Sequence, residues 1–565
     1  MKKQYRHILS LLENCKSMGE LKQLHGLMIT TSIIRSIIPL SRLIDFCANS
    51  DYGNAKYAEL VFHQIDQPSV YIWNSMIKGY SNSDNPDGAL AMYTEMQRRG
   101  YPPDNFTFPF VLKACSAIAD CNNGSCIHSR IVKTGFELDM HSSTGLLNMY
   151  ASCADMEAGL KVFDIIPKWN VVTWTSLIAG YVYNNQAMEA IRVFRNMELW
   201  DVKPNEITLV NVLVACARSR DTVMGRWVHD RVCQMGYDPF WSTLNFNIIL
   251  ATAILDMYAK CGSFRTARDL FDKMPQRNLV AWNSMIGAYN QYGRANKALH
   301  LFFDMQIAGF HPDKATFLSV ISACTQMEAL MLGQSFHAYV LKNNIGEDIA
   351  IGTALLDMYA KTGDVRSAQQ IFSELQKKDV LVWTSMIIGL ATHGHGEEAL
   401  NVFDRMQEDG AFVPDHITYI GVLCACSHAG LVEEGHRHFN SMRNIYGIVP
   451  TVEHYGCMVD LLSRAGCLGE AENLVEKMTM EPSIAIWSAL LNGCKIHENV
   501  VLANRVRGHI TELEPHSSGI YVLLSNIYAG VGMWLEVGKT RDLMRHGRIP
   551  KDCGGSSVQT KMLSS

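Results

Sequence analysis

The 565-residue chain contains no run of 18 or more apolar residues, so the sequence predicts no membrane-spanning helix. It also lacks an excess of charge of one sign, because 50 basic side chains stand against 55 acidic ones and leave a net charge of −5. This balance argues against a protein that binds nucleic acids or membranes by charge alone. Charged residues make up 19% of the chain and hydrophobic residues 48%, which is sufficient for a large core.

Cysteine pairs with the spacing of a metal site are also absent. The 16 cysteines are spread along the chain without framework spacing, and no C-x-x-C occurs. We expect reduced, mostly buried thiols in a non-secreted protein. The first twelve residues carry four basic side chains but no apolar secretory core, so no clear presequence is visible. No proline-rich or charged linker divides the chain.

What the sequence does contain is a repeat of about one hundred residues, marked by tryptophan. The repeated tryptophans, spaced by 101, 108, 101 and 104 residues, are Trp73, Trp174, Trp282, Trp383 and Trp487. The first four lie in similar phrases, WNSMIKGY, WTSLIAGY, WNSMIGAY and WTSMIIGL. An alanine, an aromatic residue and a methionine follow each phrase at fixed offsets, as Ala89, Tyr93 and Met96 follow the first.

The spacing within each unit is helical. Trp73, Ile77 and Tyr80 share one face of an α-helix, and Ala89 and Met96 share one face of a second helix. Because no such pair buries its own apolar faces, pairs must stack. The long period divides into three units, and we expect about a dozen pairs up to residue 483 and two more beyond it. The predicted fold is all-α, an α-solenoid superhelix of stacked antiparallel helix pairs.

These phrases resemble those of the plant pentatricopeptide repeat (PPR) family. WNSMIKGYSNSDNPDGALAMYTEMQRRGYPPD is similar to its standard repeat, NFTFPFVLKAC to its long repeat, and LDMYAKCGSFRTARDLFDKMPQRN to its short repeat. Two segments near Trp487 and Tyr521 resemble C-terminal extension motifs. The resemblance implies a member of the PLS class and E subgroup, without a DYW deaminase domain. It divides the chain into degenerate repeats at 1–69, a tandem PPR array at 70–483 and E-type extension motifs at 484–560.

Membership of this family implies sequence-specific binding of single-stranded organellar RNA. For this class the implied task is the selection of a cytidine for C-to-U editing, with a deaminase-bearing PPR protein recruited in trans. Multiple organellar RNA editing factor proteins are the other implied partners, and no membrane is expected. The implied location is the mitochondrion, with the chloroplast as the alternative. Organellar RNA processing, splicing or stabilisation stays open as an alternative function, and a protein-binding helical-repeat scaffold is a third.

Two positions in each repeat are candidates for reading a base. The first reader is the residue after each tryptophan or its equivalent, about 100° around the helix and off the packed stripe. The second reader is the residue that ends the unit. By resemblance, these two positions specify the base. The expected pairs are Asn74 with Asp104 and Asn283 with Asp313 for uracil, Thr144 with Asn170, Thr175 with Asn205 and Thr252 with Asn278 for adenine, and Thr353 with Asp379 and Thr384 with Asp415 for guanine.

Other residues at these positions qualify the assignment. The long repeats carry residues without hydrogen-bonding side chains at the first reader, Pro109, Val210, Leu318 and Ile420, so they should discriminate weakly. Asp and Asn before a helix are also ordinary N-caps, and the second readers can serve both purposes. A surface that tracks phosphates should be basic, and the lysines expected to line it are Lys78, Lys113, Lys260 and Lys361.

No catalytic or metal-binding constellation is expected in this chain. His395, Gly396 and Glu397 match the H-x-E of a zinc deaminase, but the P-C-x-x-C partner is absent, and Cys424 and Cys426 are too close together. The sequence therefore predicts no cofactor and no enzyme activity of its own. The final segment around Cys553 departs from the family's usual Pro-Gly-Cys-Ser.

Overall fold

A computed structural model describes residues 2–236, 247–343, 348–513 and 518–546. These residues form helices and no strand, which confirms the all-α prediction. Contacts divide the chain into one unit at Met1–Ala288 and another at Tyr289–Ser565. In the described part of the chain, no helix is long and apolar enough to cross a membrane. The segment around Cys553 lies outside the described residues.

The first unit contains α1 (Lys2–Glu13), α2 (Met18–Thr30), the 3-10 helix η1 (Ile33–Arg35), α3 (Ile37–Asn49), α4 (Ala55–Phe62), α5 (Val70–Asn82), α6 (Pro86–Arg98), α7 (Thr107–Ile118), α8 (Cys121–Thr134), α9 (Met140–Ser152), α10 (Met156–Ile165), α11 (Val171–Tyr183), α12 (Ala187–Leu199), α13 (Glu206–Ser219), α14 (Thr222–Gln234), α15 (Ile248–Lys260) and α16 (Phe264–Lys273). Helix α17 (Leu279–Gln291) contains the boundary between the units. The second unit continues with α18 (Ala295–Ile307), α19 (Lys314–Gln326), α20 (Leu330–Lys342), α21 (Ile349–Lys361), α22 (Val365–Glu374), α23 (Val380–Thr392), α24 (Gly396–Asp409), α25 (His416–Ala429), α26 (Val432–Asn444), α27 (Val452–Arg464), α28 (Leu468–Glu476), α29 (Ile484–Ile496), α30 (Val500–Leu513), α31 (Ser518–Gly530) and α32 (Trp534–His546).

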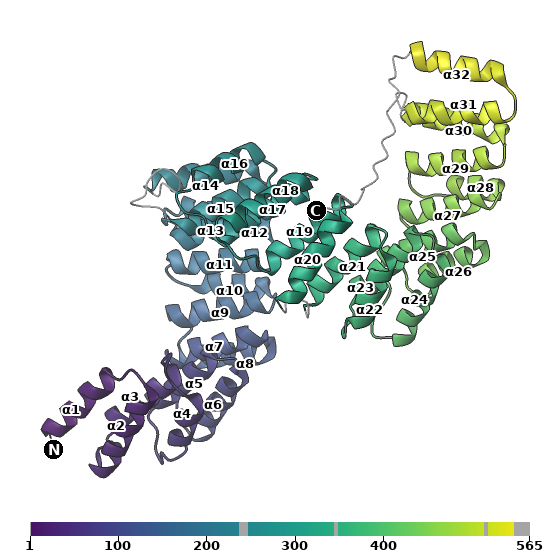
Figure 1. The fold of residues 1–565 in the computed structure, drawn as a ribbon. Helices are drawn as coiled ribbons and strands as arrows, with labels where there is room; N and C mark the ends of the chain where they lie inside the picture. The colour runs from purple at the N-terminus through teal and green to yellow at the C-terminus, as the bar shows by residue number, and fades with distance from the viewer. Residues whose placement is uncertain (1, 237–246, 344–347, 514–517, 547–565) are drawn as a thin grey trace, which may run out of the picture. The chain divides into compact units, whose positions relative to one another are not determined.

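The helices are arranged as stacked pairs (Figure 1). Within each unit, an odd-numbered helix packs against the even-numbered helix that follows it and against the next odd-numbered helix. The odd-numbered helices, called first helices below, therefore form one layer, and the even-numbered second helices form the other. This is the predicted α-solenoid of helix pairs. The expectation of about a dozen pairs up to residue 483 was slightly low, because α1 to α28 make fourteen pairs.

Four of the five repeated tryptophans, Trp73, Trp174, Trp282 and Trp383, belong to the core as predicted, whereas Trp487 is half-buried. Trp73 is completely buried. The ring of Phe62 from the preceding repeat packs edge-on against it, with 4.7 Å between the two ring centroids. The same edge-on contact joins Phe163 to Trp174 at 4.8 Å and recurs at Trp282 and Trp383. Because each of these four tryptophans contacts the repeat before it, the stripe holds successive pairs together and leaves other residues of the first helices to contact a ligand.

Glycine sets the distance between neighbouring first helices. A Cβ at Gly79 on α5 would lie 2.7 Å from the carbonyl oxygen of Ala48 and 2.9 Å from its Cβ on α3. Gly180 faces Ala151 in the same way, with a Cβ that would lie 2.9 Å from the Ala151 Cβ. The first helices therefore approach one another to backbone contact, which only a residue without a side chain allows.

Replacement of Gly79 by alanine should destabilise the protein by about 1–3 kcal/mol, because the new methyl group meets backbone that has no room to move. Gly26→Ala on α2 is the matched control, since nothing lies within 4 Å of its Cβ position and alanine has the higher helix propensity. Urea unfolding of both variants measures the difference. Equal stability of the two variants would contradict the close contact between α3 and α5.

Every cysteine in the described residues is free, as expected, but fewer are buried than the sequence suggested. Six are buried, seven are half-buried, and Cys126 and Cys233 are exposed. The reason is that many cysteines lie at helix ends, where neighbouring repeats cover them only partly, as they do for Cys153 and Cys261.

One buried cysteine recurs in each long repeat, as Cys115, Cys216, Cys324 and Cys426, and burial raises the pKa of each thiol to about 12. Only the thiolate reacts with an alkylating agent, so these four should remain unmodified at pH 8, well below that pKa. Exposed Cys126 should react readily. Iodoacetamide treatment of the folded protein followed by peptide mass spectrometry measures this, and equal labelling of Cys115 and Cys126 would be inconsistent with the packing described.

Candidate nucleic-acid interface

The second-reader residues cap the first helices that follow them. Each uses its Oδ1 to accept a hydrogen bond from the backbone N–H three residues on, which confirms their role as caps. The pairs are Asp104–Thr107 (2.9 Å), Asn170–Thr173 (3.0 Å), Asn205–Thr208 (2.9 Å), Asn278–Ala281 (2.8 Å), Asp313–Thr316 (2.9 Å), Asp379–Val382 (2.9 Å) and Asp415–Thr418 (2.8 Å). Because capping engages only Oδ1, the second carboxylate oxygen of Asp415 and the amide nitrogen of Asn205 can contact another partner.

The first-reader residues are more buried than the sequence predicted. Asn74 and Thr175 are each 8% exposed, and Thr384 is only 3% exposed. Thr252 and Thr353 are similarly buried, whereas Thr144 and Asn283 are half-buried. The expectation that these side chains lie away from packed surfaces was therefore wrong for most of them. The close approach of neighbouring first helices is the reason, since it places the residue beside each tryptophan at the contact between two first helices.

The structure brings two of the predicted pairs into direct contact. The Asn74 amide donates to the Asp104 carboxylate at 2.9 Å, and the Thr252 hydroxyl lies 3.3 Å from the Asn278 side-chain oxygen. The hydroxyl of Thr353 instead donates to the Ile349 carbonyl of its own helix at 2.7 Å.

The Thr144 and Asn170 side chains both turn to Met140. The Thr144 hydroxyl donates to the Met140 carbonyl at 2.8 Å, and the Asn170 amide contacts the Met140 thioether. Asn283 lies on α17, and Asp313 caps α19. The remaining pairs, Thr175 with Asn205 and Thr384 with Asp415, are connected through a third residue, as described below.

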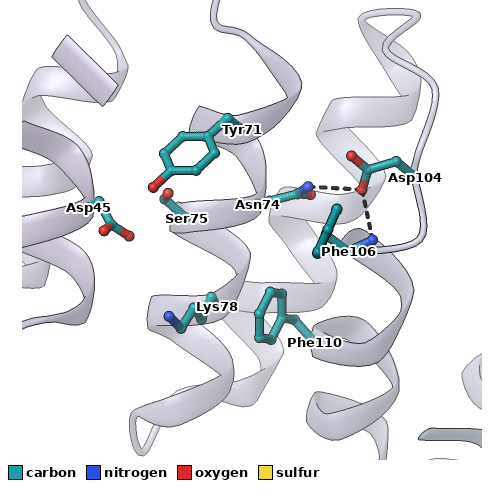
Figure 2. Close-up of a pocket in the computed structure, with 8 residues that line it drawn as sticks. All are labelled: Asp45, Tyr71, Asn74, Ser75, Lys78, Asp104, Phe106 and Phe110. Atoms are coloured by element: carbon teal, nitrogen blue, oxygen red, sulfur yellow. Dashed lines mark hydrogen bonds between the residues drawn. The ribbon is translucent and has the colours of Figure 1, made fainter. Parts of the chain in front are cut away.

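Cavities open at two of the first readers. One of about 420 Å³ surrounds Asn74 and Asp104, with Tyr71 of the same repeat and Phe106 of the next on either side of Asn74 (Figure 2). Another of about 400 Å³ contains Thr144, and Val172 of the next repeat lines it. Each cavity therefore combines a polar reader with apolar side chains from two successive first helices, which suits a flat polar ligand such as a base.

An exposed apolar residue lies three positions before many first readers, a feature that the sequence analysis missed. Eight first helices carry one, namely Ile38, Tyr71, Val172, Ile207, Ile249, Val280, Leu381 and Ile417, and Phe106 is the residue directly before α7. Residues three apart share a helix face, so each lies one turn from its reader. Their regular exposure provides successive flat or branched surfaces for stacking. The sequence signal was an apolar residue at a constant offset from the reader but outside the tryptophan stripe.

The predicted lysines lie on the first helices, but most have partners there. Lys78 lines the Asn74 cavity together with Asp45, and its Nζ lies 5.9 Å from the Phe110 ring. Lys113 donates to Asn82 at 2.6 Å. Lys260 pairs with Asp256 at 2.8 Å, and Lys361 pairs with Asp357 at 2.9 Å. These ion pairs reduce the positive charge of the layer. Among the described residues, no group of three or more His, Cys, Asp and Glu side chains is placed to hold a metal ion.

The helix pairs are stacked, and the reader positions repeat along the layer of first helices. Together, these features define a helical-repeat protein with one candidate ligand contact per repeat. Comparison with known families agrees with this description. The PPR repeat family matches residues 68–117, 169–218 and 277–326, and the single PPR repeat matches 250–279, 353–380, 381–410, 417–445 and 453–481. The E motif matches residues 497–559, within the predicted extension. The chain belongs to the pentatricopeptide repeat family, and the E motif supports the E subgroup.

Curated relatives extend over almost the whole chain. A pentatricopeptide repeat-containing protein of Arabidopsis thaliana, At3g05240, is 58% identical over 99% of this chain and 100% of its own length. Two others come from the same plant. At2g22410, mitochondrial, is 36% identical over 98% of this chain and 85% of its own length. At1g08070, chloroplastic, is 37% identical over 98% of this chain and 78% of its own length.

Solved structures show the same fold. The pentatricopeptide repeat protein PPR10 from maize matches with a TM-score of 0.59 and 17% identity, over 95% of this chain and 88% of that one. PPR10 in complex with an 18-nt psaJ RNA element matches with a TM-score of 0.55 and 15% identity, over 96% of this chain and 92% of the PPR10 chain.

Proposed function

We propose that this protein binds single-stranded RNA and reads selected bases, one per repeat, with the seven reader pairs. The observation that carries the proposal is the combination of a capping Asp or Asn, a polar first reader and an exposed apolar residue, which recurs in the repeats of Asn74, Thr175, Thr252, Asn283 and Thr384. The complex of PPR10 with RNA supports it, because the two proteins share a fold. Stacking on the apolar residues supplies affinity that does not depend on a basic surface, which suits a chain of net charge −5.

The atoms left open by the caps account for the expected base preferences. In Asn205 the amide nitrogen is available, a donor that matches N1 of adenine, whereas in Asp415 the second carboxylate oxygen is available, an acceptor that matches the N1–H of guanine. A Thr hydroxyl beside either residue offers a lone pair to the exocyclic amino group. In chain order, the pairs then favour a segment of the form 5′-U-n-A-A-n-A-U-n-G-G-n-n, with the less defined repeats at both ends.

The E motif favours a role in C-to-U editing of organellar transcripts, in which this PLS-class protein selects the cytidine and a deaminase-bearing PPR protein acts in trans. The extension presents exposed apolar side chains for such a partner, including Trp534 and Leu535 on α32, which are 70% and 71% exposed. Multiple organellar RNA editing factor proteins are further proposed partners. The relatives named mitochondrial and chloroplastic support an organelle, and the mitochondrion is the first proposed location.

Sequencing of mitochondrial and plastid cDNA from plants with and without this protein tests the editing role. We expect C-to-U conversion to be lost at one or a few sites that lie downstream of a matching RNA segment. Altered transcript ends or splicing with unchanged editing would support the alternative role in RNA processing, splicing or stabilisation. No transcript change would favour a protein-binding scaffold over RNA recognition.

A further inference from the structure

Each of four reader pairs has a buried threonine beside it that is not itself one of the predicted readers. Four first helices that follow a standard repeat carry threonine at their third residue after the cap, and all four side chains are completely buried. They are Thr107, Thr208, Thr316 and Thr418. Each hydroxyl accepts a hydrogen bond from the backbone N–H of the capping residue, at 3.0 Å in Asp104 and 3.3 Å in Asn205 and Asp415. A capping box explains this part of the geometry.

The same hydroxyl also reaches the first reader of the preceding repeat. In the first unit, Thr107 Oγ1 lies 2.7 Å from Asn74 Oδ1 and 2.9 Å from Asp104 Oδ1. The Asn74 amide nitrogen lies 2.9 Å from the same Asp104 oxygen. The three side chains therefore form a closed triangle in which the Asn74 amide has one orientation, with its nitrogen toward the carboxylate and its oxygen toward the hydroxyl.

The two Thr-type readers have an equivalent arrangement. Thr175 Oγ1 lies 2.6 Å from Thr208 Oγ1, which lies 2.8 Å from Asn205 Oδ1. In the second unit, Thr384 Oγ1 lies 2.7 Å from Thr418 Oγ1, which lies 2.8 Å from Asp415 Oδ1.

Proton counting shows what each first reader presents to a ligand. The Asp415 carboxylate accepts only, so the proton of Thr418 goes to it and the Thr384 hydroxyl donates to Thr418. The Thr175 hydroxyl has two acceptors, Thr208 Oγ1 at 2.6 Å and the Val171 carbonyl of its own helix at 2.6 Å. In both repeats the single proton of the first reader is donated within the protein, so only its lone pairs face a ligand.

The short repeats lack this connection. The residue at the same place after Asn278 is Ala281, and after Asp379 it is the completely buried Val382. Thr353 donates to its own helix at Ile349, a bond that Thr175 also makes at Val171, so the difference between the two repeats is the threonine of the next helix. Thr173, at the third position after Asn170, donates to the Asn170 carbonyl. The same chain therefore contains reader pairs with and without the bridging threonine on one scaffold.

We propose that Thr107, Thr208 and Thr418 are positioning residues that set the base specificity of the preceding repeat. Each fixes which atoms of the first reader face the base, so that the specificity of a standard repeat belongs to three residues and not two. The proposal rests on the proposed function, because it assumes that the readers contact RNA bases. It predicts that standard repeats discriminate between bases more strongly than short repeats with the same reader pair.

Reciprocal isosteric substitutions in the full chain test the proposal. Thr418→Val removes the hydroxyl beside the Thr384–Asp415 pair, and Val382→Thr adds one beside the Thr353–Asp379 pair, with the same two residue types at equivalent places. We expect the preference for guanine over the other bases to fall about fivefold to tenfold at the first position and to rise at the second, on the scale of one hydrogen bond. Thr418→Ser, which keeps the hydroxyl, should restore the preference.

The readout is the ratio of dissociation constants for RNAs that differ only at the base opposite each repeat, with thermal unfolding measured in parallel. If the threonine has only a structural role, its replacement should weaken the binding of all RNAs equally or lower only the stability of the protein. Either result would overturn the proposal. An unchanged base preference in either variant would also overturn it. If the wild-type chain binds RNA without a base preference at these repeats, the proposed reading mechanism itself fails and the positioning role fails with it.

Discussion

Asp415→Asn should change the base preferred opposite the Thr384 repeat from guanine to adenine, and Asn205→Asp should make the reverse change opposite the Thr175 repeat. Both residues cap a helix with Oδ1, and the capping strengths of Asn and Asp are similar, so the substitution replaces only the atom that remains available. An exchange of donor for acceptor on a base edge changes discrimination by about 1–3 kcal/mol, or about tenfold to a hundredfold in affinity. Fluorescence anisotropy with RNAs that carry each of the four bases at these positions measures the effect.

The appropriate control is Asp364→Asn. Asp364 caps the second helix α22 through the backbone N–H of Ser367, so it has the same capping chemistry away from the first helices. It should leave base preference unchanged. A loss of RNA affinity in Asp415→Asn that is equal for all four bases, without a new preference for adenine, would contradict the assignment of Asp415 as a reader.

Replacement of both Tyr71 and Phe106 by alanine should lower RNA affinity about tenfold or more without a change in base preference. These rings are 50% and 63% exposed on either side of the Asn74 cavity, and base–aromatic stacking contributes about 1–3 kcal/mol per base. Titration of the variant with a fixed RNA of the expected sequence measures the loss, which should be similar for RNAs with uracil and cytosine opposite this repeat.

Val223→Ala on the second helix α14 provides the comparison, because Val223 is 81% exposed but lies in the other helix layer. We expect its RNA affinity to equal that of the wild type. Equal losses in Val223→Ala and in the Tyr71 and Phe106 variant would show that exposed apolar area in general, and not the layer of first helices, supports binding.

The fold was predictable from the sequence because the features that determine it recur. Trp73 and its counterparts repeat with a helical offset to alanine and methionine, so the pattern shows both helices of a pair and the need to stack them. The positions of the second readers were also predictable, since Asp104 and its counterparts precede a helix and act as caps in the structure. Local periodicity and capping chemistry are properties of neighbouring residues, which a sequence displays directly.

The environment of the first readers was not predictable in the same way, because it depends on how closely successive repeats approach. Asn74 is buried where Asp104 and Thr107, which lie at the start of the next first helix, contact its side chain at 2.9 Å and 2.7 Å. The bridging role of Thr107 depends on the same approach. The capping-box spacing from Asp104 to Thr107 was visible in the sequence, but the hydrogen bond to Asn74 was not. Ion pairing of Lys260 with Asp256 likewise shows that a basic residue on the reading layer need not be a free charge.

Selection of bound RNAs from a fully randomised pool by the full chain, followed by sequencing, tests directly whether the reader pairs recognise bases. We expect an enriched motif with uracil opposite the Asn74 repeat, and purines opposite the repeats of Thr175, Thr252 and Thr384, in the order of the chain. Enrichment without purines at the positions of the threonine readers, or no enrichment at all, would contradict the claim that these pairs read RNA.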